Sequence, residues 1–160
     1  MKTDNKIVKV DELKRKIAEH RKKGERIAFT NGCFDILHLG HVSYLEKAKS
    51  GGRVLIIGLN SDRSVRKIKG KNRPINNQEA RAKVLAALEY VDYVVIFDEE
   101  TPLKLIEAVK PDVLIKGADW KEQEVVGADV VKAAGGKVEL VPYLASYSTS
   151  GTIAMIQKNG

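Results

Sequence analysis

The sequence predicts an α/β fold in which one parallel sheet of five strands is covered by helices on both faces. Five short apolar runs alternate with segments of helical period, which favours βαβ units with right-handed connections. The 160 residues are 43% hydrophobic, which is the size and composition of one globular domain. We therefore expect a Rossmann-like, doubly wound parallel sheet in a single domain over 1–160, with a core of about 26–157 and an N-terminal helix at 10–23.

Each predicted strand is a short, mostly aliphatic run. VLIIGL and YVVIF contain no charged residue, which is typical of strands that are buried on both faces of a sheet. Turn and helix signals separate the runs from one another. The five predicted strands are 26–30, 54–59, 93–97, 112–116 and 137–142.

Each predicted helix has an apolar stripe and a start or stop signal. Gly24 follows the first helix, Asn77 is a good N-terminal cap, and Pro102 and Pro111 bracket another helix. The basic segment 63–73 is expected to be a loop. The predicted helices are 10–23, 42–50, 77–88, 103–110, 125–134 and 150–158.

Charge and cysteine content narrow the function classes. There are 28 Lys+Arg against 21 Asp+Glu, a net charge of +7, which indicates anionic partners without distinguishing nucleic acids, nucleotides and sugar phosphates. A single cysteine, Cys33, excludes an intrachain disulfide and fits a reducing cytoplasm. No apolar run approaches the roughly 18 residues of a membrane helix, so we expect a cytoplasmic protein without membrane contact. One segment, 63–73, contains six basic residues and no acidic one. The six are Arg63, Arg66, Lys67, Lys69, Lys71 and Arg73.

The loop after the first predicted strand, NGCFDILHLGH, holds the strongest candidates for chemistry. In parallel sheets of this kind ligands bind beyond the carboxyl ends of the strands. His38 and His41 lie about one turn apart at a helix N-terminus, where free N–H groups attract anions. Gly32 and Gly40 leave room for a phosphate near the backbone. The sequence contains neither G-x-G-x-x-G after this strand nor a Walker loop, so another kind of phosphate site is expected.

Structural alternatives exist for several of these residues. The two histidines could ligate zinc with Cys33 and Asp35, but the spacing lacks tight metal-like pairing, and we predict no protein metal ligand. Cys33 is interpreted as a small loop residue, because no base is placed to make it a nucleophile. Asp62 could be a plain helix cap.

Two motifs resemble those of the cytidylyltransferase-like nucleotidyltransferases. GCFD at 32–35 followed by HLGH at 38–41 matches the H-x-G-H signature that follows the first strand in that family, and the S-T-S of 148–150 matches its S-T-[ST] motif. Longer stretches between Ile27 and Ile156 are similar to the adenylyltransferases of ADP-heptose synthesis. These are often fused to a sugar kinase domain, which this sequence lacks, so we expect a stand-alone form that depends on a separate kinase.

This resemblance implies a reaction and its participants. AMP would pass from ATP to a heptose 1-phosphate by in-line attack, with release of pyrophosphate and formation of an ADP-heptose for lipopolysaccharide or surface glycans. Mg²⁺ is implied, held largely by phosphate oxygens and water. Relatives commonly form homodimers. The expected partner is therefore a small sugar phosphate, with no nucleic acid and no membrane.

The resemblance also implies roles for individual residues. His41 would contact the α-phosphate in the transition state, His38 the phosphate chain beside it, and Lys69 would clamp the phosphates, with Lys71 and Arg66 as alternatives. Trp120 could pack on the adenine or cover the core. The residues expected to bind the nucleotide are Asn31, Gly32, Cys33, Phe34, Gly40, Arg81, Lys116, Gly117, Asp119, Ser148, Thr149 and Ser150.

Not all candidates have one interpretation. Asp35, Asn60 and Asp62 are the candidates for the sugar, the last two by position and hydrogen-bonding capacity. Arg81 could instead be a solvent-facing helical charge. Ser148 and its two neighbours could form an ordinary cap.

Two other functions stay open on the sequence. A cytidylyltransferase could act on glycerol 3-phosphate or another small phosphate, although 143–147 lacks the arginine that glycerol-phosphate cytidylyltransferases carry there. A non-catalytic nucleotide- or RNA-binding module could use 63–73. That segment has no Phe, Tyr or Trp, the platforms that RNA recognition commonly uses.

Overall fold

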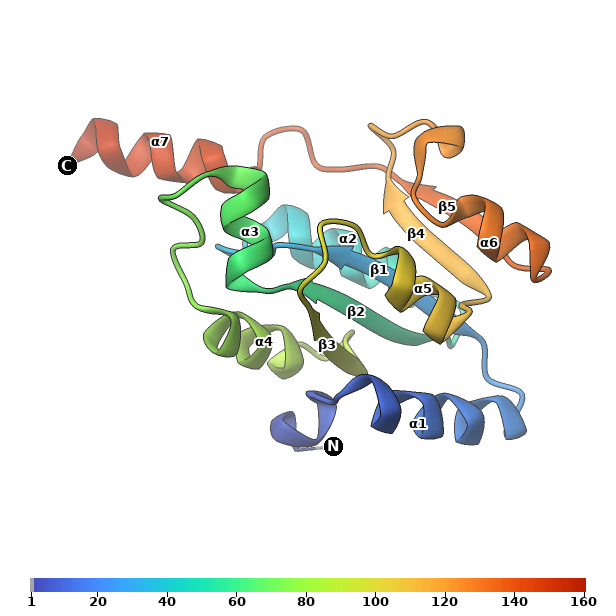
Figure 1. Ribbon diagram of the computed structural model, residues 1–160. Coiled ribbons are helices and arrows are strands. Elements are labelled where there is room, and N and C mark those ends of the chain that lie inside the picture. The colour runs from blue at the N-terminus through green and yellow to red at the C-terminus, as the bar shows by residue number, and fades with distance from the viewer. Residues whose placement is uncertain (1) are drawn as a thin grey trace.

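The computed structural model describes residues 2–160 and contains one five-stranded parallel sheet between two layers of helices (Figure 1). The predicted fold class is confirmed, and each strand lies within two residues of its predicted bounds. The strand order is β3-β2-β1-β4-β5. The strands are β1 Ile27–Gly32, β2 Val54–Asn60, β3 Tyr93–Phe97, β4 Val113–Gly117 and β5 Lys137–Val141.

The strand order places a switch point in the middle of the sheet. From β1 the chain winds outward through β2 and β3, and then crosses to the other side of β1 to add β4 and β5. β1 pairs with β2 over six residues, and with β4 at Ala28–Val113 and Phe29–Leu114. Because the connections on the two sides of β1 lead in opposite directions, a crevice is expected between the carboxyl ends of β1 and β4.

One helix was not expected from the sequence. The basic segment predicted as a loop is helical as far as Lys69, and Ser61 caps this helix by accepting a hydrogen bond from the Ser64 N–H at 3.1 Å. Asp62 is therefore the first helical residue and not the cap. The helices are α1 Val10–Lys22, α2 Leu39–Lys49, α3 Asp62–Lys69, α4 Gln78–Ala87, α5 Leu103–Val109, α6 Ala128–Ala133 and α7 Thr149–Asn159, with the 3-10 turns η1 Thr3–Lys6 and η2 Glu122–Glu124.

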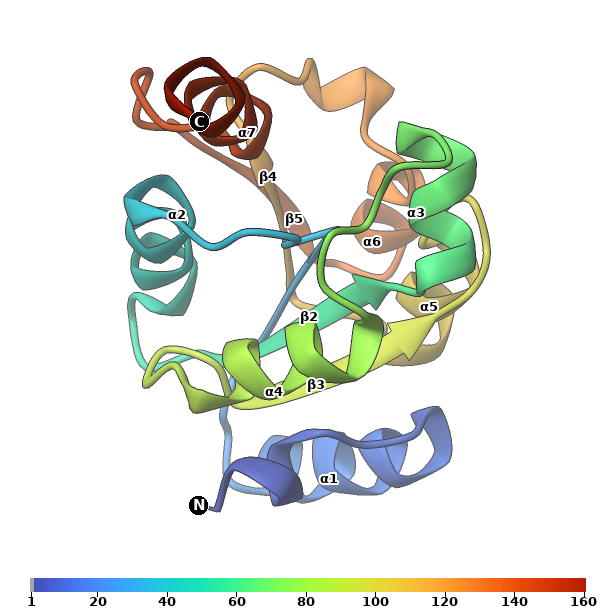
Figure 2. The same ribbon diagram turned by 90° about the vertical axis from the view of Figure 1, so that its left-hand side faces the viewer.

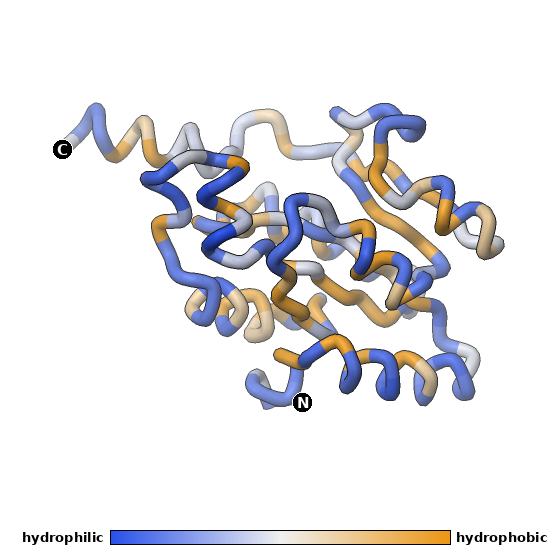
Figure 3. The backbone as a smooth tube through the Cα atoms, viewed as in Figure 1, coloured by the Kyte–Doolittle hydropathy of each residue, from blue (hydrophilic) through white to orange (hydrophobic). Residues whose placement is uncertain are grey.

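Two hydrophobic cores occupy the two faces of the sheet. Phe29 and Ile56 face α1, α5 and α6, whereas Leu55 and Ile57 face α2 and α4. Successive side chains of a strand point to opposite faces, so a strand covered on both sides must be apolar at every position. In Figure 3 the central strands are mostly hydrophobic, whereas hydrophobic and hydrophilic segments alternate along the surrounding helices. Burial of each large aliphatic side chain contributes about 1.5–3 kcal/mol.

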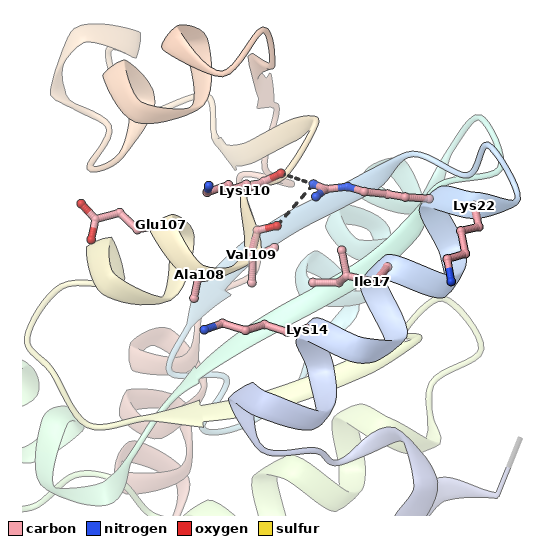
Figure 4. A pocket seen from close by; sticks show the side chains of 9 residues that line it. Lys14, Ile17, Lys22, Glu107, Ala108, Val109 and Lys110 are labelled. Atoms are coloured by element: carbon pink, nitrogen blue, oxygen red, sulfur yellow. Dashed lines mark hydrogen bonds between the residues drawn. The ribbon is translucent and has the colours of Figure 1, made fainter.

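The helices at the two ends of the chain differ in how they are held. α1 packs beside α5 (Figure 4). Arg21 donates hydrogen bonds to the carbonyl oxygens of Val109, at 3.4 Å, and Lys110. These bonds supply partners for carbonyl groups at the C-terminal end of α5. α7 has no buried side chain and projects from the body of the molecule (Figure 1). Among residues 2–160, no helix is both long and apolar enough to cross a bilayer.

Candidate active site

A pocket of about 760 Å³ lies at the carboxyl ends of the strands. Figure 2 shows α2 and α7 on one side of these strand ends and α3 on the other. The pocket brings together most of the residues that the sequence analysis selected. Those that line it are Asn31, Gly32, Cys33, Phe34, Asp35, His38, His41, Asn60, Lys69, Lys116, Asp119, Ser148, Thr149 and Ser150.

Gly40 and Gly117 do not line the pocket but lie directly behind its wall. A Cβ atom at Gly40 would be 2.9 Å from Nδ1 of His38, and one at Gly117 would be 1.9 Å from the ring of Tyr143. Both distances are too short for any side chain. The two glycines therefore make room for lining side chains, and not directly for a ligand.

Arg81 lies beneath the pocket and not in it. It is only 2% exposed, so the solvent-facing alternative is wrong. Its guanidinium donates to the carbonyl oxygens of Cys33 (2.6 Å), Asn60 (2.9 Å) and Asn76 (2.9 Å), and to Oδ1 of Asp62 (2.8 Å). Neither Arg81 nor Asp62 lines the pocket; together they form an ion pair, buried on the Arg81 side and partly exposed at Asp62, that supports two residues of the pocket floor.

His38 and His41 form a stacked pair at the start of α2. Their ring centroids are 3.9 Å apart, and Nδ1 of each is buried without a hydrogen-bond partner among residues 2–160. Burial lowers the pKa of both rings, and with the added repulsion of His38 the pKa of His41 falls to about 4. Both imidazoles are thus neutral at pH 7, each with one N–H to donate and one nitrogen to accept.

The start of α7 lies beside the histidine pair. The Ser148 hydroxyl accepts a hydrogen bond from an N–H of the first helical turn at 3.0 Å, and Thr149 Oγ1 donates to the carbonyl oxygen of Ile36 at 3.2 Å. The rings of His38 and Tyr147 are 6.4 Å apart. Two helix N-termini therefore meet on one side of the pocket, and each offers free N–H groups and a positive dipole end to an anion.

Asp35 lines the pocket, but its carboxylate is already occupied. It accepts hydrogen bonds from the N–H groups of Ile75 and Asn76 and from Arg73 Nε at 2.7 Å. Burial alone would raise the pKa of Asp35, but these donors outweigh it and lower the pKa. Asp35 thus holds the segment between α3 and α4 against the loop after β1.

Lys69 is the lysine of the basic segment that reaches the pocket. The two alternatives, Lys71 and Arg66, do not line it. Three of the other basic residues in this segment form ion pairs with carboxylates of the protein, so the segment is less suited to bind RNA. The ion pairs are Arg63–Asp98, Lys67–Glu100 and Arg73–Asp35.

The end of β4 contributes a buried ammonium group. Lys116 Nζ donates a hydrogen bond to Oδ1 of Asn31 and lies 5.8 Å from the centroid of the Trp120 ring. Burial lowers the pKa of Lys116 to about 8, against the opposing effect of Asp119. Trp120 is 44% exposed and lines the pocket, so it does not cover the core.

The sequence analysis missed three tyrosines that line the pocket, Tyr44, Tyr143 and Tyr147. Tyr143 and Tyr147 line the pocket just before the start of α7, and the ring of Tyr143 stacks on Tyr44 at 5.4 Å. Tyr44 is held by a 2.8 Å hydrogen bond between its hydroxyl and Oγ1 of Thr30. Aromatic residues directly preceding a candidate phosphate motif were the available signal. Asn60, selected for the sugar, is 3% exposed and donates from Nδ2 to Ser64 Oγ at 2.9 Å.

The family described as cytidylyltransferase-like matches residues 29–152, a range that contains both helix starts and the floor between them. The chain belongs to the cytidylyltransferase-like family. This confirms the resemblance inferred from the sequence, and it identifies the chain as a nucleotidyltransferase. Membership in the cytidylyltransferase-like family also explains why the described motifs meet in one pocket, since both lie within the matched range.

Proteins with high sequence identity share the same region. The chain is 54% identical over 154 residues to bifunctional protein HldE of Geobacter metallireducens, covering 96% of this chain and 31% of that protein. It is 54% identical over 155 residues to bifunctional protein HldE of Wolinella succinogenes, covering 97% of this chain and 32% of that protein. The chain therefore spans about a third of the length of these curated relatives.

Solved structures support the cytidylyltransferase-like fold. The lipopolysaccharide core biosynthesis protein of Thermoplasma volcanium superimposes with a TM-score of 0.61 at 30% identity, over 74% of this chain and 96% of that one. The pantoate-beta-alanine ligase of Francisella tularensis, solved with beta-gamma ATP and beta-alanine, superimposes with a TM-score of 0.59 at 19% identity, over 95% and 76%. The second likeness concerns the fold alone.

Proposed function

We propose that this nucleotidyltransferase transfers AMP from ATP to a heptose 1-phosphate, releasing pyrophosphate and forming an ADP-heptose. The observation that carries the proposal is the stacked pair His38 and His41, with unpartnered Nδ1 atoms, at the junction of two helix N-termini. Such a junction suits a chain of phosphates. The choice of a heptose rests on the resemblance to HldE proteins and on the lipopolysaccharide core biosynthesis neighbour.

Catalysis in this proposal is alignment and charge stabilisation. The acceptor's phosphate oxygen is already an anion, so no general base and no covalent enzyme intermediate are required. His41 donates a hydrogen bond to the α-phosphate as charge builds up there, and His38 contacts the adjoining phosphate. The N-terminus of α7, with Ser148 as its cap, holds the departing pyrophosphate.

Lys69 completes the phosphate site from the opposite wall. It lies at the end of α3, which is joined to α4 by a segment that Arg73 and Asp35 fix to the loop after β1. The ammonium of Lys69 would reach across the phosphates and offset their charge. Because a long flexible stem carries this charge, it can follow the phosphates as they separate.

Mg²⁺ enters the proposal as part of the nucleotide substrate. Within residues 2–160 there is no group of three or more His, Cys, Asp or Glu that could hold a metal ion, and the carboxylate of Asp35 is committed to Arg73 and two N–H groups. The side chains of the pocket are therefore compatible with an ion that phosphate oxygens and water hold, as they commonly hold Mg²⁺. Bound in this way, the ion would neutralise part of the triphosphate charge.

A pyrophosphate-release screen tests the proposal. ATP, CTP, GTP and UTP would each be combined with heptose 1-phosphate, other sugar 1-phosphates, glycerol 3-phosphate and other polyol phosphates. Release only with ATP and heptose 1-phosphate is expected. Preferential release with CTP and glycerol 3-phosphate would favour the cytidylyltransferase alternative instead.

The proposal includes two partners of the enzyme. A sugar kinase must act before it, because the acceptor carries a phosphate ester. A second copy of the chain is expected as a homodimer, and the exposed Met155 and Ile156 of α7 are compatible with a further contact. Light scattering of the purified chain measures the subunit number directly.

A further inference from the structure

Lys116 is a cation that lines the pocket away from the two helix N-termini. β1 and β4 pair at Ala28–Val113 and Phe29–Leu114, and the same register places Asn31 opposite Lys116. Beyond the paired residues, the Lys116 ammonium bonds to the Asn31 side chain across the switch point. The ammonium therefore lies on the floor of the pocket, where the two halves of the sheet separate.

This ammonium has unused hydrogen-bonding capacity. It has three N–H donors, of which Asn31 takes one, and the Trp120 ring 5.8 Å away supplies an apolar flank. None of the ion pairs found within residues 2–160 includes Lys116, although Asp119 lies near enough to act on it electrostatically. A partly buried cation that faces a pocket without a bonded counter-ion is a favourable contact point for an anion.

The geometry of in-line displacement indicates which anion this is. The attacking and leaving oxygens must lie on opposite sides of the α-phosphorus. If α7 and the histidine pair hold the nucleotide phosphates, the attacking group must approach from the strand ends and α3. Among residues 2–160, the cations that line those surfaces without a carboxylate partner are Lys116 and Lys69, and Lys69 is already assigned to the nucleotide phosphates.

We infer that Lys116 binds the phosphate group of the acceptor, a sugar 1-phosphate, on the floor of the pocket; the inference rests on the proposed function. This assigns Lys116 to the acceptor, whereas the sequence analysis placed it with the nucleotide. Asn31 orients the ammonium, and the Trp120 ring covers one side of it, which reduces its contact with water and strengthens the contact with phosphate. Lys116 is thus a determinant of which phosphate ester can attack.

Steady-state kinetics of two variants test this inference. Lys116→Met keeps the length of the side chain and removes the charge, and we expect the acceptor KM to rise about 10- to 100-fold, the loss of one or two charge-assisted hydrogen bonds. The ATP KM should stay within about threefold, because uniform binding of the nucleotide is untouched. Lys116→Arg should restore most of the acceptor affinity. Lys121→Ala, at an exposed position outside the pocket, is the matched control.

Three results would overturn the inference. These are a loss confined to the ATP KM, no change in either KM, and failure of Lys116→Arg to restore acceptor binding while the protein remains folded by circular dichroism. Should Lys116→Met not fold, Lys116→Gln and Lys116→Arg carry the same comparison. A merely structural role would lower stability without separating the two KM values.

The inference and the proposed function fail in different ways. If another phosphate ester replaces heptose 1-phosphate in the pyrophosphate-release screen, the same KM comparison with that ester still tests Lys116. If no ester is turned over, calorimetry with inorganic phosphate as the probe, in the presence of α,β-methylene-ATP, decides the matter. Weaker phosphate binding by Lys116→Met than by the native protein supports the inference, and equal affinities overturn it.

Discussion

Replacement of Arg81 by leucine tests whether this arginine supports the pocket or binds phosphate. The side chain is fully buried, with four hydrogen bonds of 2.6–2.9 Å, three to carbonyl oxygens and one to Asp62. Its removal leaves three carbonyl oxygens without their donor and the partly exposed Asp62 without its counter-ion, which together cost about 3–5 kcal/mol. For a domain of this size, about 2–4 °C are lost per kcal/mol, so we expect the Tm of Arg81→Leu to fall by about 6–20 °C.

The assay is thermal unfolding followed by circular dichroism, combined with steady-state kinetics at a temperature where both proteins are folded. Lys83→Ala is the control, since Lys83 lies on the same helix and pairs with Asp4 at the surface; its loss should cost no more than about 1 kcal/mol. Arg81→Lys keeps the charge but loses the planar guanidinium, so its Tm should lie between those of Arg81→Leu and Lys83→Ala. A Tm within about 2 °C of the native value, together with a raised ATP KM, would refute the supporting role and return Arg81 to the phosphates.

Four further predictions concern His41 and Lys69, the residues proposed to contact the nucleotide phosphates. His41→Ala should lower turnover by about 100-fold or more, as does loss of one oxyanion donor at about 3 kcal/mol, whereas His20→Ala on α1 should leave turnover unchanged; equal activity of the two variants would contradict the mechanism. Lys69→Ala should raise the ATP KM and slow turnover, and Lys71→Ala should do neither; the reverse pattern would transfer the clamp to Lys71. In NMR titrations the pKa of His41 should be about 4 in the free protein and higher with nucleotide bound, because the phosphates favour the imidazolium. The unfolded chain binds this proton more readily than the folded one, so the free energy of unfolding should fall as the pH drops from about 6.5 to 4, and His41→Ala should flatten that dependence.

Patterns local in the chain were predictable from the sequence. The continuous apolar runs located the strands, because a strand buried on both faces needs apolar residues throughout. The histidine motif and the S-T-S cap were placed correctly at helix starts, since N-terminal signals depend on neighbouring residues only. These local signals were therefore enough to predict the residues at the two helix N-termini of the pocket.

Contacts between distant residues were not predictable. α3 was missed because it is short and rich in basic residues, and Val65 is its one buried apolar side chain. On α4 the apolar Val84 is 51% exposed, whereas the charged Arg81 lies on the buried face of the helix beside Leu85. Arg81 bonds to Cys33, 48 positions earlier, and Arg73 pairs with Asp35, 38 positions earlier. Spacing along the chain contains no information about such partners.

Helix α7 contributes to the pocket but little to the stability of the fold, and this has a practical consequence. This helix buries none of its side chains, yet its first turn forms one wall of the pocket and is tied to the first loop by Thr149. Protein cleaved by a protease before Thr149 would therefore keep its melting temperature while losing its turnover. Preparations of the enzyme are best checked by intact mass, because a melting temperature does not detect this cleavage.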